Sequence, residues 1–514
     1  MKNRRFLGDL DADKDNSFSE HFVESPYLAR IKNHDSDIIY GLKGVGKTAL
    51  RRALTEFESD FFYSSKIIDL GSISFETLLK SLRKLNDTTN VEVPNLARCV
   101  WMNNLVHYGL DTLIDCMNDR TIKERIITIL RKEKFISPNA RTINNQDSAN
   151  RKILAQVERI FEYITEFGIE DTSKSTHLDL SSDQLNIFNV FPLNTEIENI
   201  LVDCSIFFKK SKKKVVVCLD GFDSIIDHTP ESRKAIFAGL IDAISRFRSD
   251  KLISEIFCYK AFLPKELTAD AETMGWDSDK IAYNVHSLKW TKSEFELFLE
   301  KRLFTHSRKR SSKFSDLWPE YMPEKLTNPV HGVEETTFDY ILRHTLGRPR
   351  QVLMHIQNIL DRWDEKFSSF KVDPSFIPQI VAETNSLMAK QVSSQLEKVY
   401  PNMHAFLRSW HNSNCIMTLY DFKDRLKTYF SEFTLTELNK LIEDIFSFGL
   451  LGIMSNKDFN KSSGKKYFKF SFSDDGAFSN IHITAKEDDY LAFCPMFREY
   501  CGFNNSEHGI IMTN

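Results

Sequence analysis

The chain has 514 residues, 41% hydrophobic and 27% charged, with a formal net charge of −4 at pH 7. This composition is typical of about three globular domains and excludes a general electrostatic affinity for nucleic acid. No apolar run approaches the roughly 18 residues of a membrane span, the start lacks a signal-peptide core, and eight scattered cysteines form no C-x-x-C pair. We therefore expect a cytoplasmic protein with buried free thiols and no membrane contact.

The first chemical motif is residues 41–48, a full match to the phosphate-binding pattern G-x-x-x-x-G-K-[ST]. An apolar run at 38–40 precedes it and a helical pattern at 49–54 follows, which is the strand–loop–helix context that the motif requires. Lys47 is expected to reach the β- and γ-phosphates of ATP, and the Thr48 hydroxyl to hold Mg²⁺. The residues expected at the nucleotide are Gly41, Gly44, Gly46, Lys47, Thr48 and Ala49.

Strands and helices alternate after this loop, which favours an α/β domain with a central, mainly parallel sheet. The expected elements are a strand at 66–70, a helix at 75–85, a helical insertion at about 90–212, a strand at 215–219, a helix at 231–248 and strands at 256–263 and 282–288. Ligands of such sheets bind at the carboxyl ends of the strands. The phosphate-binding loop and Asp220, which ends the strand at 215–219, are therefore expected at one site.

Carboxylates near this strand end are the candidates for metal binding and hydrolysis. Asp220 is predicted to hold Mg²⁺ opposite Thr48, and the alternative is an Asp that caps the next turn. Asp223 is the candidate for polarising the attacking water, although it also suits a helix N-cap, and Asp227 is a weaker candidate.

Two arginines in Gly347-Arg-Pro-Arg350 open a helical pattern further along the chain. Arg348 and Arg350 are candidates for contacting the γ-phosphate from a lid, and the alternative is a pair of salt-bridging surface residues. Arg302 is a further candidate of the same kind.

The C-terminal part changes from helices to strands. Helices are expected at 419–430 and 435–448, strands at 450–454 and 466–472 joined by a polar turn, and a flexible tail at 504–514. Helices followed by a β-hairpin indicate a winged helix. Its wing lysines Lys461, Lys465 and Lys466 suit DNA phosphates, whereas the acidic helix at 435–448 opposes entry into the major groove.

The loop with its flanks, Leu219-Asp-Gly-Phe-Asp, Leu288-Lys-Trp-Thr and Gly347-Arg-Pro-Arg together resemble the AAA+/STAND-related P-loop ATPases of bacteria, especially stand-alone ATPases of antiphage defence loci. The resemblance covers residues 1–375. It implies ATP-driven self-assembly or switching, with Arg348 or Arg350 in a sensor-2-like role. Two departures concern hydrolysis. Gly221 stands where many relatives have an acidic residue, and Pro264 stands where a polar or basic sensor is usual.

The sequence thus predicts a P-loop ATPase domain at 1–290 with its helical insertion, a helical lid domain at 291–400 and a winged-helix-like domain at 401–514. The favoured function is an ATP-binding and ATP-hydrolysing switch that forms homo-oligomers and controls a protein effector, as in antiphage defence. The alternatives are a DNA-binding ATPase similar to origin-recognition or helicase-loader proteins, and a nucleotide-holding scaffold with negligible turnover.

Overall fold

The chain folds into two compact units. The sheet unit is Pro26–Gly41 with Leu50–Leu288, and the lid unit is Met1–Ser25, Leu42–Ala49 and Lys289–Asn514. The computed structural model describes residues 7–24, 28, 31, 37–57, 62–71, 75–89, 92–133, 195–222, 230–264, 285–305, 307, 313–367, 371–462, 465–472, 485–504 and 510–513.

The sheet unit is built on five parallel strands in the order β2-β3-β4-β1-β5. They are β1 (Ile38–Gly41), β2 (Ser64–Asp69), β3 (Val215–Asp220), β4 (Phe257–Pro264) and β5 (Val285–Ser287). Val215 to Leu219 in β3 are fully buried, as a continuous apolar run inside a parallel sheet requires. All carboxyl ends share one edge, so the end of β1 and Asp220 lie at the same edge of the sheet.

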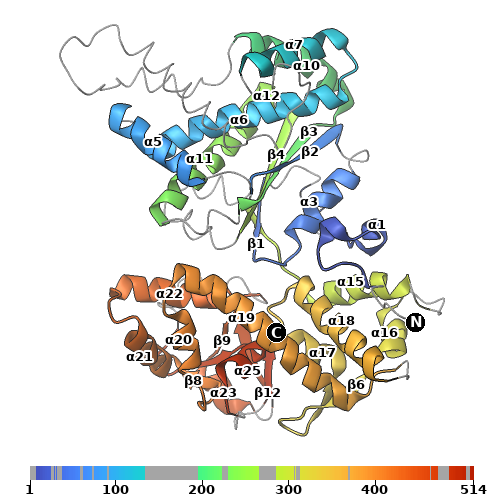
Figure 1. The fold of residues 1–514 in the computed structure, drawn as a ribbon, viewed down its shortest axis with the longest axis vertical. Helices are drawn as coiled ribbons and strands as arrows, with labels where there is room; N and C mark the ends of the chain where they lie inside the picture. Colours follow the sequence, from blue (N-terminus) through green and yellow to red (C-terminus); the bar gives the residue numbers. More distant parts are fainter. Residues whose placement is uncertain are drawn as a thin grey trace. The chain divides into compact units, whose positions relative to one another are not determined.

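Helices cover this sheet and form a large apolar core with it (Figure 1). The helices of this core are α5 (Phe75–Thr89), α6 (Val93–Cys116), α7 (Arg120–Lys132), α10 (Thr195–Ser211), α11 (Pro230–Ser249) and α12 (Lys251–Ile256). The helix α3 (Lys47–Glu56) follows β1 in the chain. α6 packs against α11 and against β2 and β3. Nineteen consecutive residues of α6, Leu96 to Ile114, are buried, which makes this helix an internal layer of the unit.

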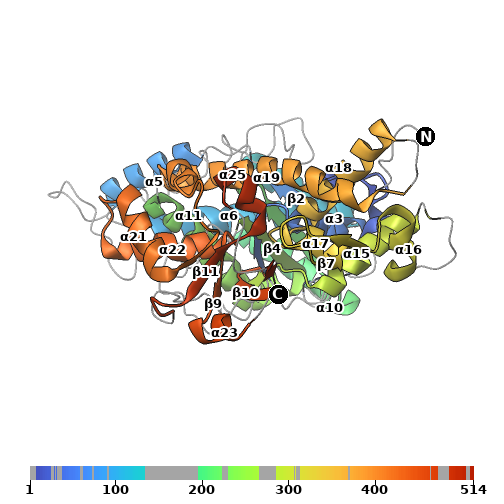
Figure 2. The same cartoon turned by 90° about the horizontal axis from the view of Figure 1, so that it is seen from below.

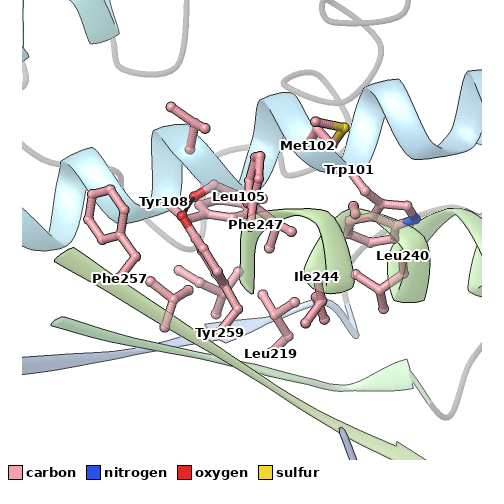
Figure 3. Packing of buried hydrophobic residues seen from close by; sticks show 14 of the residues in the cluster. Trp101, Met102, Leu105, Tyr108, Leu219, Leu240, Ile244, Phe247, Phe257 and Tyr259 are labelled. Carbon is pink, nitrogen blue, oxygen red and sulfur yellow. Dashed lines mark hydrogen bonds between the residues drawn. The ribbon is translucent and has the colours of Figure 1, made fainter. Parts of the chain in front are cut away.

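Aromatic side chains fill the space between α6, α11 and the strands (Figure 3). Trp101 of α6 donates its indole N–H to the carbonyl of Ile236, and the Tyr259 hydroxyl of β4 donates to the carbonyl of Leu105 at 3.0 Å. These polar ends are satisfied inside the core, so the rings are held in fixed orientations.

The first part of the lid unit is a helical domain that includes the start of the chain. Its elements are η2 (Ala12–Lys14), α1 (Phe18–His21), α15 (Lys292–Phe304), α16 (Phe314–Tyr321), the hairpin β6 (Lys325–Thr327) and β7 (Glu334–Thr336), α17 (Thr337–Arg343), α18 (Pro349–Lys366), η6 (Pro374–Phe376) and α19 (Ile377–Val399). Leu7 and Val23 are buried in the core formed by these helices. The N-terminal segment is therefore a structural part of the lid domain.

The C-terminal part of the lid unit has helices followed by a sheet, of which Figure 2 labels β9, β10 and β11. The strand order of this sheet is β12-β10-β9-β11-β8. The elements are α20 (Met403–Arg408), β8 (Ile416–Thr418), α21 (Leu419–Tyr429), α22 (Leu435–Ser447), β9 (Leu451–Met454), α23 (Asn456–Lys461), β10 (Lys465–Phe470), β11 (Tyr490–Phe493), η7 (Pro495–Phe497), α25 (Arg498–Cys501) and β12 (Ile510–Thr513). The predicted fold class is confirmed: a parallel α/β core, helices that follow it and a winged-helix-like C-terminal part.

The antiparallel pairing of β9 with β10 is present, and the short helix α23, with its N-cap at Ser455, lies between them. Residues 463–464 of the expected polar turn lie outside the described residues. One local prediction in this part is wrong. The expected flexible tail contains β12, which pairs in parallel with β10. None of the described helices is long and apolar enough to cross a membrane. The eight cysteines are free thiols, and seven of them are buried.

Candidate nucleotide-binding site

The phosphate-binding loop has the backbone that its glycines permit. It leaves β1 at Gly41 and enters α3 at Lys47. Gly44 and Gly46 have φ angles of +88° and +109°, which side-chain-bearing residues rarely adopt. The pattern and its strand–loop–helix context are therefore both present.

The carbonyl groups of the loop accept hydrogen bonds, several of them from residues that follow the sheet unit in the chain. The Lys47 ammonium donates to the carbonyl of Leu42 at 3.3 Å. The Trp290 indole N–H donates to Val45 at 2.8 Å, the Arg348 guanidinium to Lys43 at 3.2 Å and the Arg350 backbone N–H to Gly44 at 3.4 Å. All these residues belong to the lid unit.

Arg348 and Arg350 therefore lie beside the loop, as expected of residues near a nucleotide. Arg348 is the buried N-cap residue of α18, and Pro349 follows as the first helical residue. The Arg350 side chain donates from Nε to the carbonyl of Leu10 at 3.2 Å. In this structure both guanidinium groups contact backbone carbonyls, and their action on a γ-phosphate stays a prediction.

Asp220 lies at the end of β3 and is bound on both carboxylate oxygens. Arg51 of α3 lies 3.0 Å from its Oδ2, with the two side chains only 10% and 17% exposed. The backbone N–H of Gly221 donates to Oδ1 at 2.9 Å. The carboxylate is thus held in place at the strand end. Oxygen ligands of this kind suit Mg²⁺, so the residue type fits the predicted metal role.

Gly221 occupies a position that excludes a side chain. Its φ angle is +88°, and an added Cβ would lie 2.3 Å from Oδ1 of Asp69 and 2.5 Å from the backbone nitrogen of Gly71. The end of β2 approaches the end of β3 too closely for an acidic residue at position 221. The strand-end packing in this structure is therefore incompatible with an acidic side chain directly after Asp220.

Asp69 is a second carboxylate at this edge that the sequence analysis overlooked. It ends β2 and is the direct register partner of Asp220. Its side chain is exposed, and its Oδ1 accepts from the Gly71 backbone at 2.9 Å. A signal was available, because Asp69 lies near the end of the expected strand at 66–70, just as Asp220 directly follows the strand at 215–219. Arg51, one helical turn after Thr48, was also overlooked.

Other predicted residues are placed as follows. Thr48 and Ala49 lie in the first turn of α3, and Pro264 ends β4 beside Gly41 in register. Asp223 and Asp227 lie outside the described residues. Within the described ranges no group of three or more His, Cys, Asp or Glu side chains is arranged to hold a metal ion.

Arg302 is buried, and its contacts are with the N-terminal segment and with its own helix. Its guanidinium donates to the carbonyl of His21 at 2.8 Å and lies 3.9 Å from the carboxylate of Asp15, while its ring contact is Phe298. Burial lowers the pKa of Arg302 to about 10, with the Asp15 charge opposing that change. The prediction of a nucleotide contact at Arg302 is wrong, because this side chain anchors the N-terminal segment on α15.

Lys466 is likewise not a surface residue. It is 7% exposed, and its ammonium donates to the carbonyls of Phe459 and Ser462, each at 2.6 Å. Its prediction as a DNA phosphate contact is therefore wrong. Lys461 is exposed at the end of α23 and Lys465 is half-buried on β10.

Comparison with known proteins does not assign the chain to a family. No model of a known protein family matches the chain, and no curated protein matches it significantly. The solved structure of the Aeropyrum pernix ORC2 protein in ADPNP–ADP complexes aligns over 97% of this chain and 96% of that chain, with 10% identity and a TM-score of 0.34. The ADP form of ORC2 aligns over 88% and 91%, with 10% identity and a TM-score of 0.27. Scores this low add nothing to the argument from the chain's own sheet and loop.

Proposed function

We propose that this protein is a nucleotide-dependent switch that binds Mg·ATP at the loop from Gly41 to Thr48. The observation that carries the proposal is the loop itself, with two left-handed glycines between a buried parallel strand and a helix. Backbone N–H groups and the start of α3 then face a phosphate chain, and Lys47 supplies the positive charge. Thr48 and Asp220 are the proposed Mg²⁺ ligands, on the grounds of the loop pattern and the strand-end position.

Slow or partner-dependent hydrolysis is the second part of the proposal. Water polarisation is assigned to Asp223, because the packing at Gly221 excludes an acid directly after Asp220. Asp69 is the natural comparison, since it ends the neighbouring strand. A turnover assay of Asp223→Asn and Asp69→Asn tests the assignment. The assignment to Asp223 is supported if Asp223→Asn alone loses hydrolysis while it still binds ATP. If only Asp69→Asn loses hydrolysis, Asp69 is the residue that polarises the water.

The resemblance to AAA+/STAND-related ATPases motivates the remaining parts. We propose that nucleotide exchange drives homo-oligomerisation and that the assembled form controls a protein effector, with antiphage defence as the setting. These parts rest on the motif order given above. Size-exclusion chromatography with light scattering, in ADP and in a non-hydrolysable ATP analogue, tests the assembly. An unchanged mass in both nucleotides contradicts it.

Nucleotide binding is tested by thermal unfolding of wild type and Lys47→Ala with and without Mg·ATP. At about 100 times Kd, ATP adds about 2.7 kcal/mol to wild-type stability. The Lys47→Ala variant should show no such gain, while its melting temperature without nucleotide stays near the wild-type value. If saturating Mg·ATP leaves the melting temperature of wild type unchanged, the proposed function is rejected.

A DNA-acting ATPase is the second candidate, and one observation favours it. Lys465, Tyr467 and Lys469 alternate along β10 on the side opposite Phe468 and Phe470, and Tyr467 is 46% exposed. Lysines beside an exposed aromatic ring suit a phosphate backbone and stacked bases. Duplex binding that weakens with salt, and weakens further in Lys465→Ala, supports this candidate. An ATP hydrolysis rate that duplex DNA does not change favours the partner-controlling switch.

A nucleotide-holding scaffold is the third candidate. Gly221, which excludes an acidic side chain, and Pro264, at the end of β4, favour it because both lack the group that a fast hydrolase would carry there. Tight ATP binding without measurable turnover, in wild type and in Asp223→Asn alike, is the result that would select the scaffold.

A further inference from the structure

Three successive peptide groups of the phosphate-binding loop are held by residues that lie more than 200 positions later in the chain. The carbonyl of Lys43 accepts from the Arg348 guanidinium at 3.2 Å, that of Gly44 from the Arg350 backbone at 3.4 Å and that of Val45 from the Trp290 indole at 2.8 Å. The indole bond is the shortest of the three. It is also the one in which an aromatic side chain supplies the donor.

Holding these carbonyls also sets the direction of the loop amides. A trans peptide is planar, with the C=O of one residue pointing opposite to the N–H of the next. The bonds to Lys43 and Val45 therefore turn the N–H groups of Gly44 and Gly46 away from the donors. The Val45 N–H, between them, donates back to the carbonyl of Leu42 at 3.3 Å. The two glycine amides are the groups that this arrangement presents to an anion.

The Trp290 ring is itself fixed. It packs on Phe295 and Phe298, with both ring centroids 5.4 Å away. Thr291, directly after it, starts α15 with a capping box that involves Glu294. Ring atoms of Trp290 would lie 3.7 Å from a Cβ placed on Gly46, so the indole also borders the loop sterically. The start of α15 and the Val45–Gly46 peptide are therefore connected by a rigid side chain.

We propose that Trp290 is a positioning residue for the nucleotide: it orients the Val45–Gly46 peptide so that the Gly46 amide faces the phosphates of a nucleoside di- or triphosphate. This inference rests on the proposed function and deepens it. It also gives the loop a direct connection to α15, through which phosphate binding and the position of that helix depend on each other. Trp290 contacts the loop and not the reacting atoms.

The chain offers a matched pair of variants. Trp290→Phe keeps an aromatic ring against Phe295 and Phe298 and removes the N–H. Trp318→Phe is the control, because Trp318 is 4% exposed in the same core and its indole nitrogen has no hydrogen-bond partner among the described residues. Loss of one hydrogen bond corresponds to a weakening of about fivefold to tenfold in Kd.

Two measurements on the full chain test the proposal. Calorimetric titration with Mg·ADP should give a Kd about fivefold to tenfold weaker in Trp290→Phe and unchanged in Trp318→Phe. Hydrogen exchange without nucleotide should be faster at the Val45 amide, which donates to the Leu42 carbonyl, in Trp290→Phe alone, a local change that a general loss of core stability would not give. Equal Kd values and equal loop exchange in the two variants overturn the inference. Absence of ADP and ATP binding in wild type overturns the proposed function, and loop exchange then decides the positioning role separately.

Discussion

The guanidinium of Arg51 lies 3.0 Å from the carboxylate of Asp220, although the two residues stand on different sides of the long helical segment between β2 and β3. The pair joins the helix that follows the phosphate-binding loop to the end of the β3 strand, within the sheet unit. Both side chains are largely buried, which distinguishes the pair from surface ion pairs that contribute little. Arg51 therefore holds the carboxylate that the sequence predicts for Mg²⁺.

Removing Arg51 should destabilise the sheet unit. Arg51→Ala leaves Asp220 largely buried without its cation, and we expect a loss of about 1–3 kcal/mol in the free energy of unfolding. Urea unfolding, monitored by circular dichroism, measures this change in the free energy of unfolding. Arg52→Ala is the matched control. Arg52 is the next residue of the same helix, and it pairs with Glu56, four residues later, where both side chains are more exposed than those of Arg51 and Asp220. It should cost no more than about 0.5 kcal/mol. Equal losses in the two variants would contradict a structural role of the Arg51–Asp220 pair.

Gly221 should not accept the acidic residue that many related ATPases carry at this position. Gly221→Ala combines an unfavourable φ of +88° with contacts of 2.3 Å and 2.5 Å to the end of β2. We expect a loss of about 3 kcal/mol or more, and a larger loss for Gly221→Glu. Thermal unfolding, with soluble yield as a second readout, measures the effect.

Gly332→Ala separates the two causes of this loss. Gly332 also has a positive φ, +64°, but no atom lies within 4 Å of its added Cβ. Its substitution should cost only the backbone penalty, about 1–2 kcal/mol. If Gly221→Ala is no worse than Gly332→Ala, the strand ends can separate, and packing does not explain the missing acid.

Lys466 should act on stability and not on nucleic-acid binding. Its ammonium is buried on two carbonyls and lies 4.1 Å from the Phe459 ring centroid. Lys466→Ala exposes or orphans these acceptors, and we expect a loss of about 2 kcal/mol. Lys465→Ala, at the adjacent position on β10, should leave the melting temperature within about 1 °C of wild type. A melting temperature for Lys466→Ala equal to that of Lys465→Ala would contradict the buried role.

Sequence patterns predicted the elements whose signals are local. The loop, the buried β3 strand with its terminal Asp220, and the helices α21 and α22 all follow from short motifs or periodicity. The strand β12 has only four residues and depends on pairing with β10 far from it in the chain, so no local pattern marks it. The contact between Trp290 and Val45 is equally non-local.

The error at Lys466 was avoidable from the sequence. Side chains alternate along a strand, so Lys466 shares its face with Phe468 and Phe470, whereas Lys465 and Lys469 share the other. The prediction that Lys466 contacts DNA took the wing lysines together and did not use this alternation. The exclusion of an acid at position 221 was not predictable, because it depends on the distance between the ends of β2 and β3.

Two buried histidines should make the lid unit sensitive to mild acid. His344 and His355 are buried, and their rings donate to the carbonyls of Tyr340 and His344 respectively. Burial lowers the pKa of His355 to about 4, and burial followed by the Arg343 charge lowers the pKa of His344 well below 6.5. Both rings are therefore neutral in the folded protein at neutral pH, whereas they bind protons near pH 6.5 when unfolded.

Because the unfolded chain binds these protons first, the stability that the two groups confer is complete above pH 6.5 and is lost as the pH falls toward 4. For His355 alone the loss between pH 7 and pH 5 is about 2 kcal/mol. Urea unfolding at both pH values, monitored by a lid-unit probe, measures it. His355→Gln keeps a donor for the His344 carbonyl but cannot titrate, so its stability should fall by about 2 kcal/mol less than that of wild type over this range. Parallel pH profiles for His355→Gln and wild type would show that the ring is not held neutral by burial.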